Sequence, residues 1–170
     1  GALYQPDELR SFHASWGTSF NTSGDAYSYN SLSANTAPES SQNLELGARL
    51  DSADKRYSTR LAAFRSTKLH ERNTDSSSAA TEYLLSGKRH AAGAEIEVTG
   101  RPAPRWEVFG SYMWMPIAVV DIAAPTSTTA GNRQGNRPGL SPRHSGSAWV
   151  TYQASAAWRF GGGLNFRSRQ

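Results

Sequence analysis

Residues 43–51 read Asn-Leu-Glu-Leu-Gly-Ala-Arg-Leu-Asp, so that every second residue is apolar. Successive side chains of an extended strand point to opposite sides. The apolar residues of this stretch therefore share one face, and the charged and small residues share the other. A period of two is typical of a strand whose two faces meet different surroundings. The stretch predicts such a strand.

The same alternation recurs along the chain in segments of about ten residues, whereas helical periodicity is nearly absent. One segment, residues 56–66, is less regular because Phe64 falls on the face of Arg60. We expect seven strands, over residues 10–21, 43–51, 56–66, 91–100, 106–120, 144–153 and 158–169. The sequence predicts an all-β, antiparallel protein.

The connections between these segments alternate in length. Long ones cover residues 22–42, 67–90 and 121–143, and short ones cover 52–55, 101–105 and 154–157. In an up-and-down sheet, every long loop then lies at one end and every tight turn at the other. The long connections are rich in Ser, Thr, Asn, Gly and Pro, which are typical of loops. This asymmetry is the pattern of outer-membrane β-barrels, which have short periplasmic turns and long extracellular loops.

Aromatic residues indicate a membrane interface at the end with the short turns. Four of them lie at strand ends with the apolar parity of their strands: Tyr57, Trp106, Tyr152 and Trp158. Such a row is expected of an aromatic girdle. At the opposite ends, Phe20 and Tyr112 or Trp114 offer a less regular second girdle.

The charges decide which face meets lipid. The polar faces carry Glu45, Arg49, Glu95, Glu97 and Arg159. Exposing all five to lipid costs on the order of 10 kcal/mol, because Arg or Lys at mid-membrane costs about 2–4 kcal/mol and Asp or Glu less. We therefore expect the apolar faces to point outward and the polar faces to line a wet lumen.

Composition excludes other classes. The chain has 170 residues and no Cys, and its mean hydropathy is −0.61. No run approaches the roughly 18 apolar residues of a membrane helix, so a helical membrane protein is excluded. A net charge of +4 is too small to name an anionic partner, and we expect no nucleic acid.

Several segments resemble TonB-dependent outer-membrane siderophore receptors. Residues 38–50, from Pro-Glu through Leu-Glu-Leu-Gly-Ala-Arg-Leu, are similar to the "PE…yElGvK" strand of that family, and 61–65 to the "lalFri" segment that follows. Residues 93–100 and 106–112 resemble its "GvElevsG…W…aGY" hairpin, and 142–152 with 161–166 resemble "PrHs…lWttY…vGGGvn". The similarity covers about residues 12–168 and leans toward the ferric coprogen and pyoverdine branch.

The resemblance implies an antiparallel up-and-down transmembrane β-barrel of about 22 strands, plugged by an N-terminal domain. The length accommodates about seven or eight of these strands. Because no TonB box, plug or closing aromatic strand is recognisable, we expect a piece from the C-terminal half of the barrel in the bacterial outer membrane. The implied function is TonB-driven uptake of ferric siderophores. The implied partners are the siderophore, the TonB complex through the N-terminal region, and outer-membrane lipid with lipopolysaccharide.

Candidate ligand contacts lie in the long loops. The predicted binding residues are Tyr27, Tyr29, Tyr83, Arg133 and Arg137. Arg143, Lys88 and Arg89 add positive charge there, either for an anionic ferric complex or for water and lipopolysaccharide phosphates. The four His residues show no metal-ligand spacing and no catalytic arrangement is recognisable, so we expect no enzyme and no directly bound cofactor.

Two other classes are consistent with the alternation. A small autonomous outer-membrane barrel of about eight strands, with a structural or adhesion role, should show an even strand number and a closing strand. A soluble β-sandwich binding module would turn its apolar face inward and should lack a one-sided girdle.

The face assignment predicts opposite outcomes for two substitutions in one strand. In the complete barrel, Leu46→Arg should impair membrane assembly far more than Arg49→Leu, because only the first places a charge in lipid. Heat-modifiable gel mobility measures assembly, and equal assembly of the two variants contradicts the assignment.

Overall fold

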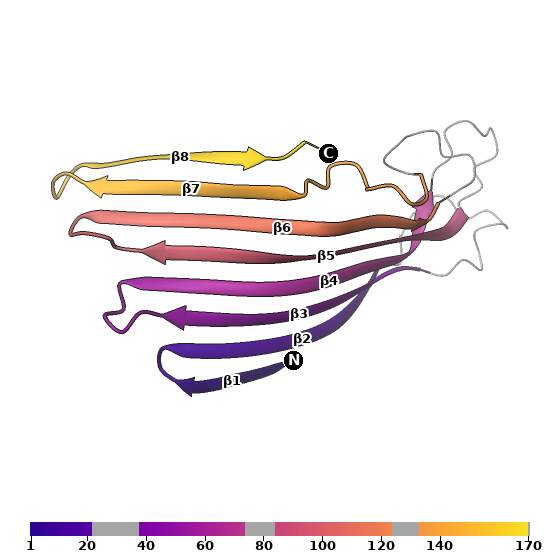
Figure 1. Cartoon of the computed structure of the whole chain (residues 1–170), viewed down its shortest axis with the longest axis horizontal. Helices are drawn as coiled ribbons and strands as arrows, with labels where there is room; N and C mark the ends of the chain where they lie inside the picture. The colour runs from indigo at the N-terminus through magenta and orange to yellow at the C-terminus, as the bar shows by residue number, and fades with distance from the viewer. Residues whose placement is uncertain (22–37, 74–83, 124–132, 170) are drawn as a thin grey trace.

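The computed structural model describes residues 1–21, 38–73, 84–123 and 133–169. Within these ranges the chain forms one antiparallel sheet of eight strands, arranged side by side in chain order (Figure 1). The strands are β1 (Ala2–Asp7), β2 (Arg10–Asn21), β3 (Glu39–Asp51), β4 (Tyr57–Asn73), β5 (Leu84–Gly100), β6 (Trp106–Ile122), β7 (His144–Gln153) and β8 (Arg159–Arg167). The all-β, up-and-down arrangement is confirmed. No helix in the described ranges is long and apolar enough to cross a bilayer.

The described residues contain one strand more than predicted, and four strands, β3 to β6, are longer. β1 escaped detection because it has only six residues and contains Pro6, which an edge strand tolerates. β3 starts at Glu39, β4 continues to Asn73 and β5 starts at Leu84, inside connections that were predicted as long loops. In these extensions, polar residues such as Gln42 occur on both faces of the strand. The sequence there therefore lacks the alternation that marks a strand.

The strand register aligns apolar residues into rows across the sheet. One row joins Phe12, Ala48, Leu61, Ile96 and Tyr112 as successive backbone partners. Because residues opposite each other in a ladder point to the same side, one face of the sheet is apolar. The parity predicted for each of these strands is confirmed.

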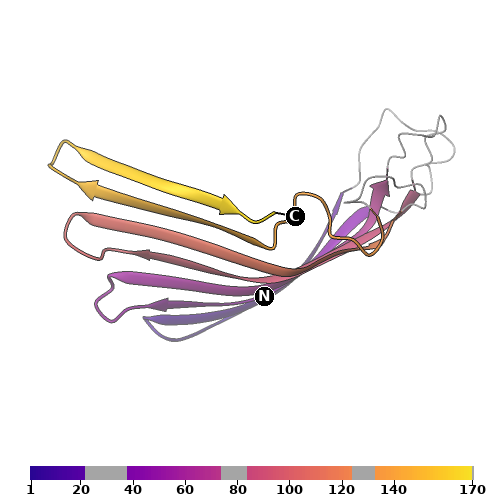
Figure 2. The same ribbon diagram turned by 45° about the horizontal axis from the view of Figure 1, so that its top comes forward.

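A second row carries the polar face. Here Arg49, Arg60, Glu97, Ser111 and Ser147 are successive partners across β3 to β7. They line a groove on the concave side of the sheet, whose curvature Figure 2 shows. The apolar face is therefore convex, as expected of a barrel wall with a polar lumen.

The described residues have almost no apolar core. Ala118 and Val120 are the only buried hydrophobic residues among them. Large side chains of the convex face are exposed, including Trp16 at 66% and Leu46 at 55%. A contiguous apolar surface of this kind marks a membrane or interaction surface. A soluble sandwich would instead cover this face with a second sheet, and none is present in the described ranges.

The sheet is open within the described residues. Its order runs from β1 to β8, and these two strands do not pair with each other. The small autonomous barrel requires that pairing. The even strand number, which the prediction of seven had missed, therefore does not favour a closed small barrel.

Short turns at one end are joined to their neighbours. The links are Lys55 Nζ to Glu8 Oε2 at 3.3 Å, the Arg56 guanidinium to the Pro102 carbonyl, and the Arg105 guanidinium to the Ala154 carbonyl at 3.4 Å. Within one turn, the Ser52 hydroxyl donates to Asp54, and this hydrogen bond lowers the pKa of that carboxyl group. The predicted girdle lies beside these turns, where the Trp106 and Tyr152 ring centroids are 4.7 Å apart.

The run of three glycines in β8 accommodates a tryptophan on the concave face. Trp149 of β7 pairs with Gly163, and a Cβ built at Gly163 would overlap the Ala148 carbonyl oxygen and the Trp149 ring. A Cβ at Gly162, on the convex face, meets nothing within 4 Å. The missing side chain at Gly163 thus permits a close approach of the Trp149 ring and the β7 backbone.

Adjacent glycines should therefore differ in their tolerance of a methyl group. We expect Gly163→Ala to lower the unfolding free energy of the barrel by about 1–3 kcal/mol, because the ring or backbone must shift. Gly162→Ala serves as the control and should change it by under about 0.5 kcal/mol. Urea unfolding in lipid vesicles measures both, and equal effects contradict the packing argument.

Candidate functional site: the concave face and its outer end

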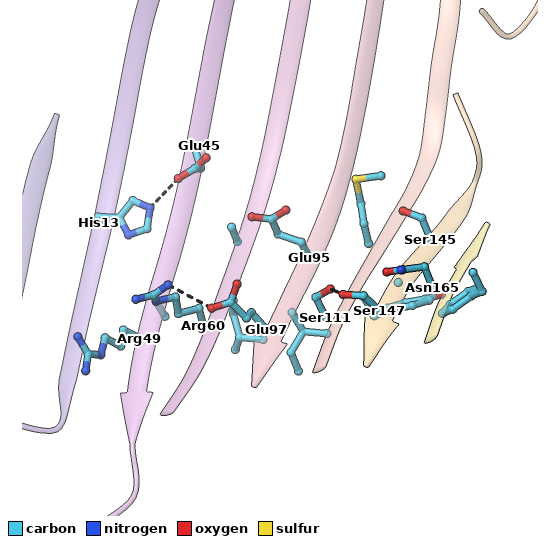
Figure 3. Close-up of a pocket in the computed structure, with 18 of the residues that line it drawn as sticks. His13, Glu45, Arg49, Arg60, Glu95, Glu97, Ser111, Ser145, Ser147 and Asn165 are labelled. Carbon is cyan, nitrogen blue, oxygen red and sulfur yellow. Dashed lines mark hydrogen bonds and ion pairs between the residues drawn. The ribbon is translucent and has the colours of Figure 1, made fainter. Parts of the chain in front are cut away.

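The concave face holds a groove of about 850 Å³ that crosses the sheet from β2 to β8. Figure 3 shows its charged and hydroxyl side chains pointing into the groove from neighbouring strands. Their placement follows from the period-two pattern, since each has the polar parity of its strand. The groove is thus the polar lumen surface that the sequence predicted.

Titratable side chains in the groove pair across adjacent strands. His13 Nε2 lies 2.8 Å from Glu45 Oε1, and Arg60 Nη1 lies 3.1 Å from Glu97 Oε1. These side chains are 36–64% exposed, so each pair contributes only about 0–1 kcal/mol to stability. Glu97 is thus a lumen-facing carboxylate that pairs with a basic group on the neighbouring strand.

Glu95 differs from its neighbours. It lies opposite Ala62 on one side and Met113 on the other. It makes no hydrogen bond or ion pair with any residue that the structure describes, and Figure 3 shows its carboxylate directed into the groove. Glu95 therefore offers an acceptor to whatever occupies the groove. The sequence alternation predicts that Glu95 lies on this face. It has no partner there because the strand register places it opposite Ala62, whose side chain is apolar.

A second charged cluster lies on the concave face near the ends of the long strands. Lys68 Nζ is 3.2 Å from Glu71 Oε1 and 3.8 Å from Glu39 Oε2, and Arg89 also pairs with Glu71. The positive charge that the sequence analysis assigned to Arg89 is therefore balanced locally. Lys88, its neighbour in sequence, has the opposite parity and belongs to the convex face.

The segment of residues 133–143 returns along the edge of β6, where the shorter β7 does not reach. Its backbone bonds there are Gly135 N to Val120 O at 2.8 Å, Val120 N to Asn136 O at 2.9 Å, and Met115 N to Arg143 O at 2.8 Å. These bonds give partners to backbone N–H and C=O groups of β6 that lie beyond its last pair with β7. The segment thereby carries the predicted residue Arg133 beside the outer half of β6.

Arg137 holds this segment against an irregular part of β6. Opposite Gly93, the β5–β6 register shifts, and Pro116 there has no N–H to donate. The Arg137 guanidinium donates to the carbonyl oxygens of Met115 and Pro116. Burial, with the nearby charge of Arg143, lowers the pKa of Arg137. Sequence reasoning missed this structural contact, and ligand binding by Arg137 stays a prediction.

The remaining candidate residues divide between the described ranges and the rest of the chain. Arg133 and Arg143 are exposed, whereas Tyr27, Tyr29 and Tyr83 lie outside the described residues. Among the described residues, no three His, Asp or Glu side chains gather where they could hold a metal ion. The binding roles proposed for the arginines and tyrosines stay predictions.

The contacts of Arg137 predict a local effect on the returning segment. Arg137→Gln should speed amide hydrogen exchange at Gly135 and Val120 by about tenfold or more, because charge-assisted hydrogen bonds contribute about 1.5–3 kcal/mol. Arg143→Gln is the control, since its side chain contributes only repulsion toward Arg137. Unchanged exchange in Arg137→Gln would show that the segment is held by its backbone bonds alone.

Comparison with known proteins gives a match over the whole chain. Residues 1–170 match the family model described as TonB dependent receptor-like, beta-barrel. The chain is 30% identical over 174 residues to the probable TonB-dependent receptor BfrD of Bordetella pertussis, covering 99% of this chain and 22% of that protein. It is 26% identical to the catecholate siderophore receptor Fiu of Escherichia coli K12, covering 98% and 22%. The chain spans about a fifth of the length of these relatives.

Solved structures share the fold. The closed form of Fiu aligns with a TM-score of 0.70 at 22% identity, over 96% of this chain and 23% of that one. The ferripyoverdine receptor of Pseudomonas aeruginosa aligns with a TM-score of 0.69 at 22% identity, over 97% and 22%. The sheet is therefore similar to a section of these barrel walls. Since a catecholate and a pyoverdine receptor both match, the expected coprogen or pyoverdine branch is not singled out.

Proposed function

Because the chain belongs to the TonB-dependent receptor β-barrel family, we propose that it forms part of the barrel wall of an outer-membrane receptor that takes up ferric siderophores. The observation that carries the proposal is the family match over residues 1–170. The described sheet supports it, because its convex face is apolar and its concave face is polar. A wall between lipid and a water-filled passage needs these two faces.

The orientation of the wall follows from the connections. The short turns are assigned to the periplasm and the long connections to the cell exterior, as in outer-membrane barrels. Arg133 and Arg143 then lie at the external mouth of the passage. Positive charge at such a mouth attracts anionic ligands and raises their local concentration. This effect suits a ferric siderophore complex with negative charge.

Iron enters this proposal as chelated cargo rather than as a resident cofactor. The protein binds the ferric complex and moves it without transforming it, so the groove needs no metal ligands. Fiu is named as a catecholate receptor, and the second structural neighbour is a ferripyoverdine receptor. The proposed ligand class is accordingly ferric siderophores in general. TonB is the proposed source of energy.

The proposed contacts with the ligand lie at the external end. They are Tyr27, Tyr29, Tyr83, Arg133 and Arg137. Tyrosines present flat amphipathic surfaces to a chelator, and arginines pair with anionic oxygens. Of these five, Arg133 provides the cleanest test, since the backbone bonds of residues 133–143 do not depend on its side chain.

Binding of ferric complexes by the full-length receptor tests the proposal. The probes are a ferric catecholate, ferric citrate and ferripyoverdine, each titrated against intrinsic fluorescence. We expect saturable binding of at least one, weakened by about threefold to tenfold in Arg133→Gln, because one typical hydrogen bond contributes about 0.5–1.5 kcal/mol.

Lys55→Gln is the matched control, because it removes an exposed positive charge at the opposite end of the strands. It should leave binding unchanged. Uptake of labelled iron that persists without TonB, or the absence of binding to all three probes, contradicts the proposed function.

A further inference from the structure

The short turns lie together at one end of the sheet (Figure 1), and four arginines line a cleft of about 460 Å³ there. They stand just before β4, on both sides of the connection between β5 and β6, and at the start of β8: Arg56, Arg101, Arg105 and Arg159. The one carboxylate among the described residues that line this cleft is Glu107. The lining therefore carries four positive charges against one negative charge.

Glu107 is already shared between two of these arginines. Its Oε1 lies 3.1 Å from Arg101 Nη2, and its Oε2 lies 3.4 Å from Arg159 Nη1. Each carboxylate oxygen thus faces a different guanidinium. Because Glu107 carries a single negative charge, the two pairs together retain a positive charge.

The other two arginines have carbonyl oxygens as partners. The Arg56 guanidinium donates to the carbonyl oxygens of Arg101 and Pro102, and Arg105 Nη1 donates to that of Ala154 at 3.4 Å. Neither guanidinium forms an ion pair with a carboxylate within the described part of the chain. Both side chains are exposed, and each guanidinium has more N–H groups than these carbonyl oxygens accept.

The carboxylate of the neighbouring turn, Asp54, is held by its own turn. It accepts hydrogen bonds from the Ser52 hydroxyl at 2.5 Å and from the Arg56 backbone N–H at 3.1 Å. It attracts the Arg56 guanidinium through space but forms no ion pair with it. Arg56 and Arg105 are therefore available to an anion in the cleft.

An aromatic surface adjoins these arginines. A second cleft of about 540 Å³ shares Arg56, Arg101 and Glu107 with the first and is also lined by Trp149. The Trp149 ring lies over the glycines of β8 on the concave face, and the residue is 51% exposed. We call the combined surface the turn-end cleft; its main residues are Arg56, Arg101, Arg105, Glu107, Trp149 and Arg159.

The turn-end cleft faces the passage and not the lipid. Glu107 and Trp149 have the concave parity of β6 and β7, whereas their sequence neighbours Trp106 and Val150 are exposed on the convex face. A lipid headgroup beside the aromatic girdle therefore lies on the other side of the wall. The ligand of this surface has to arrive through the passage or from the periplasm.

We propose that the turn-end cleft is an exit site, which binds an anionic ferric siderophore complex as the complex leaves the passage for the periplasm. The guanidinium groups of Arg56 and Arg105 bind anionic oxygens of the chelator, and the Trp149 ring packs against its planar groups. The inference rests on the proposed function. It adds a second place of contact, at the opposite end of the strands from Arg133, and it specifies anionic cargo.

The exposure of the cleft suits transient binding. A site along a passage must attract its cargo and still release it. Arg56, Arg105 and Trp149 are all exposed, and ion pairs of exposed groups are weak. We therefore expect the turn-end cleft to bind less tightly than the external site.

Equilibrium dialysis of the full-length receptor in detergent tests the inference, because labelled iron counts the complexes bound per receptor. The two probes are a ferric tris-catecholate, which carries three negative charges, and a ferric trihydroxamate, which is neutral. We expect one tight and one weaker site for the tris-catecholate. The neutral complex should not occupy the weaker site.

Arg56→Gln and Arg105→Gln should each weaken the weaker site by about threefold to tenfold, the effect of losing one typical hydrogen bond. The tight site should change by less than about twofold. Arg105→Lys keeps the charge and should retain most of the affinity, which a purely structural role of Arg105 does not explain.

Arg10→Gln is the matched control. It removes an exposed positive charge at the same end of the sheet, but Arg10 has the convex parity of β2 and lines neither part of the turn-end cleft. It should leave both sites within about twofold. Arg133→Gln should weaken only the tight site.

Three results overturn the inference: unchanged binding in both Arg56→Gln and Arg105→Gln, an equal loss in Arg10→Gln, or equally strong binding of the neutral complex at the weaker site. A tight site without a weaker one also overturns it and leaves the proposed function standing. The absence of both sites overturns both proposals.

Discussion

Inside a bilayer no water is available to backbone N–H and C=O groups, so each strand must satisfy them through its neighbours. Pairing from β1 to β8 in chain order gives the six inner strands, β2 to β7, a neighbour on each side within the described residues. Once the backbones are paired, each residue can point only to one side or the other. The cost of a charge in lipid then assigns Arg60 and Glu97 to the concave side and Leu61 and Ile96 to the convex side. The polar groove and the apolar convex face with its aromatic girdle follow from this division.

The sequence predicted the fold best where the two sides of a strand differ most. The bounds of β7 agree with those expected from its alternation, and Arg49 and Leu50 fall on opposite faces as predicted. The prediction failed where both sides face water. Thr67 and Lys68 are both polar although they point to opposite sides of β4, so no alternation marks the strand there. A chemical contrast across the sheet, rather than strand formation itself, produces the readable pattern.

The candidate site was predictable in its composition and less so in its pairings. Parity places Glu95 and Glu97 on one face, but register determines that Glu97 meets Arg60 and that Glu95 meets Ala62. Arg137 shows a further limit. In the sequence it is a loop cation, and its contact with β6 arises because β7 is short and Pro116 interrupts the ladder. Such contacts depend on differences in length between neighbouring strands, which local patterns do not record.

The links between neighbouring short turns have a mechanical consequence. Each link, such as Lys55 with Glu8 or Arg56 with Pro102, joins one hairpin to the next and not the two strands of one hairpin. Together they join neighbouring hairpins along the end of the sheet that carries the short turns. An exposed link contributes little by itself, about 0–1 kcal/mol, so this end resists distortion through the number of its links. A link can close only when the second hairpin has docked. This end of the sheet therefore stiffens stepwise as successive hairpins dock.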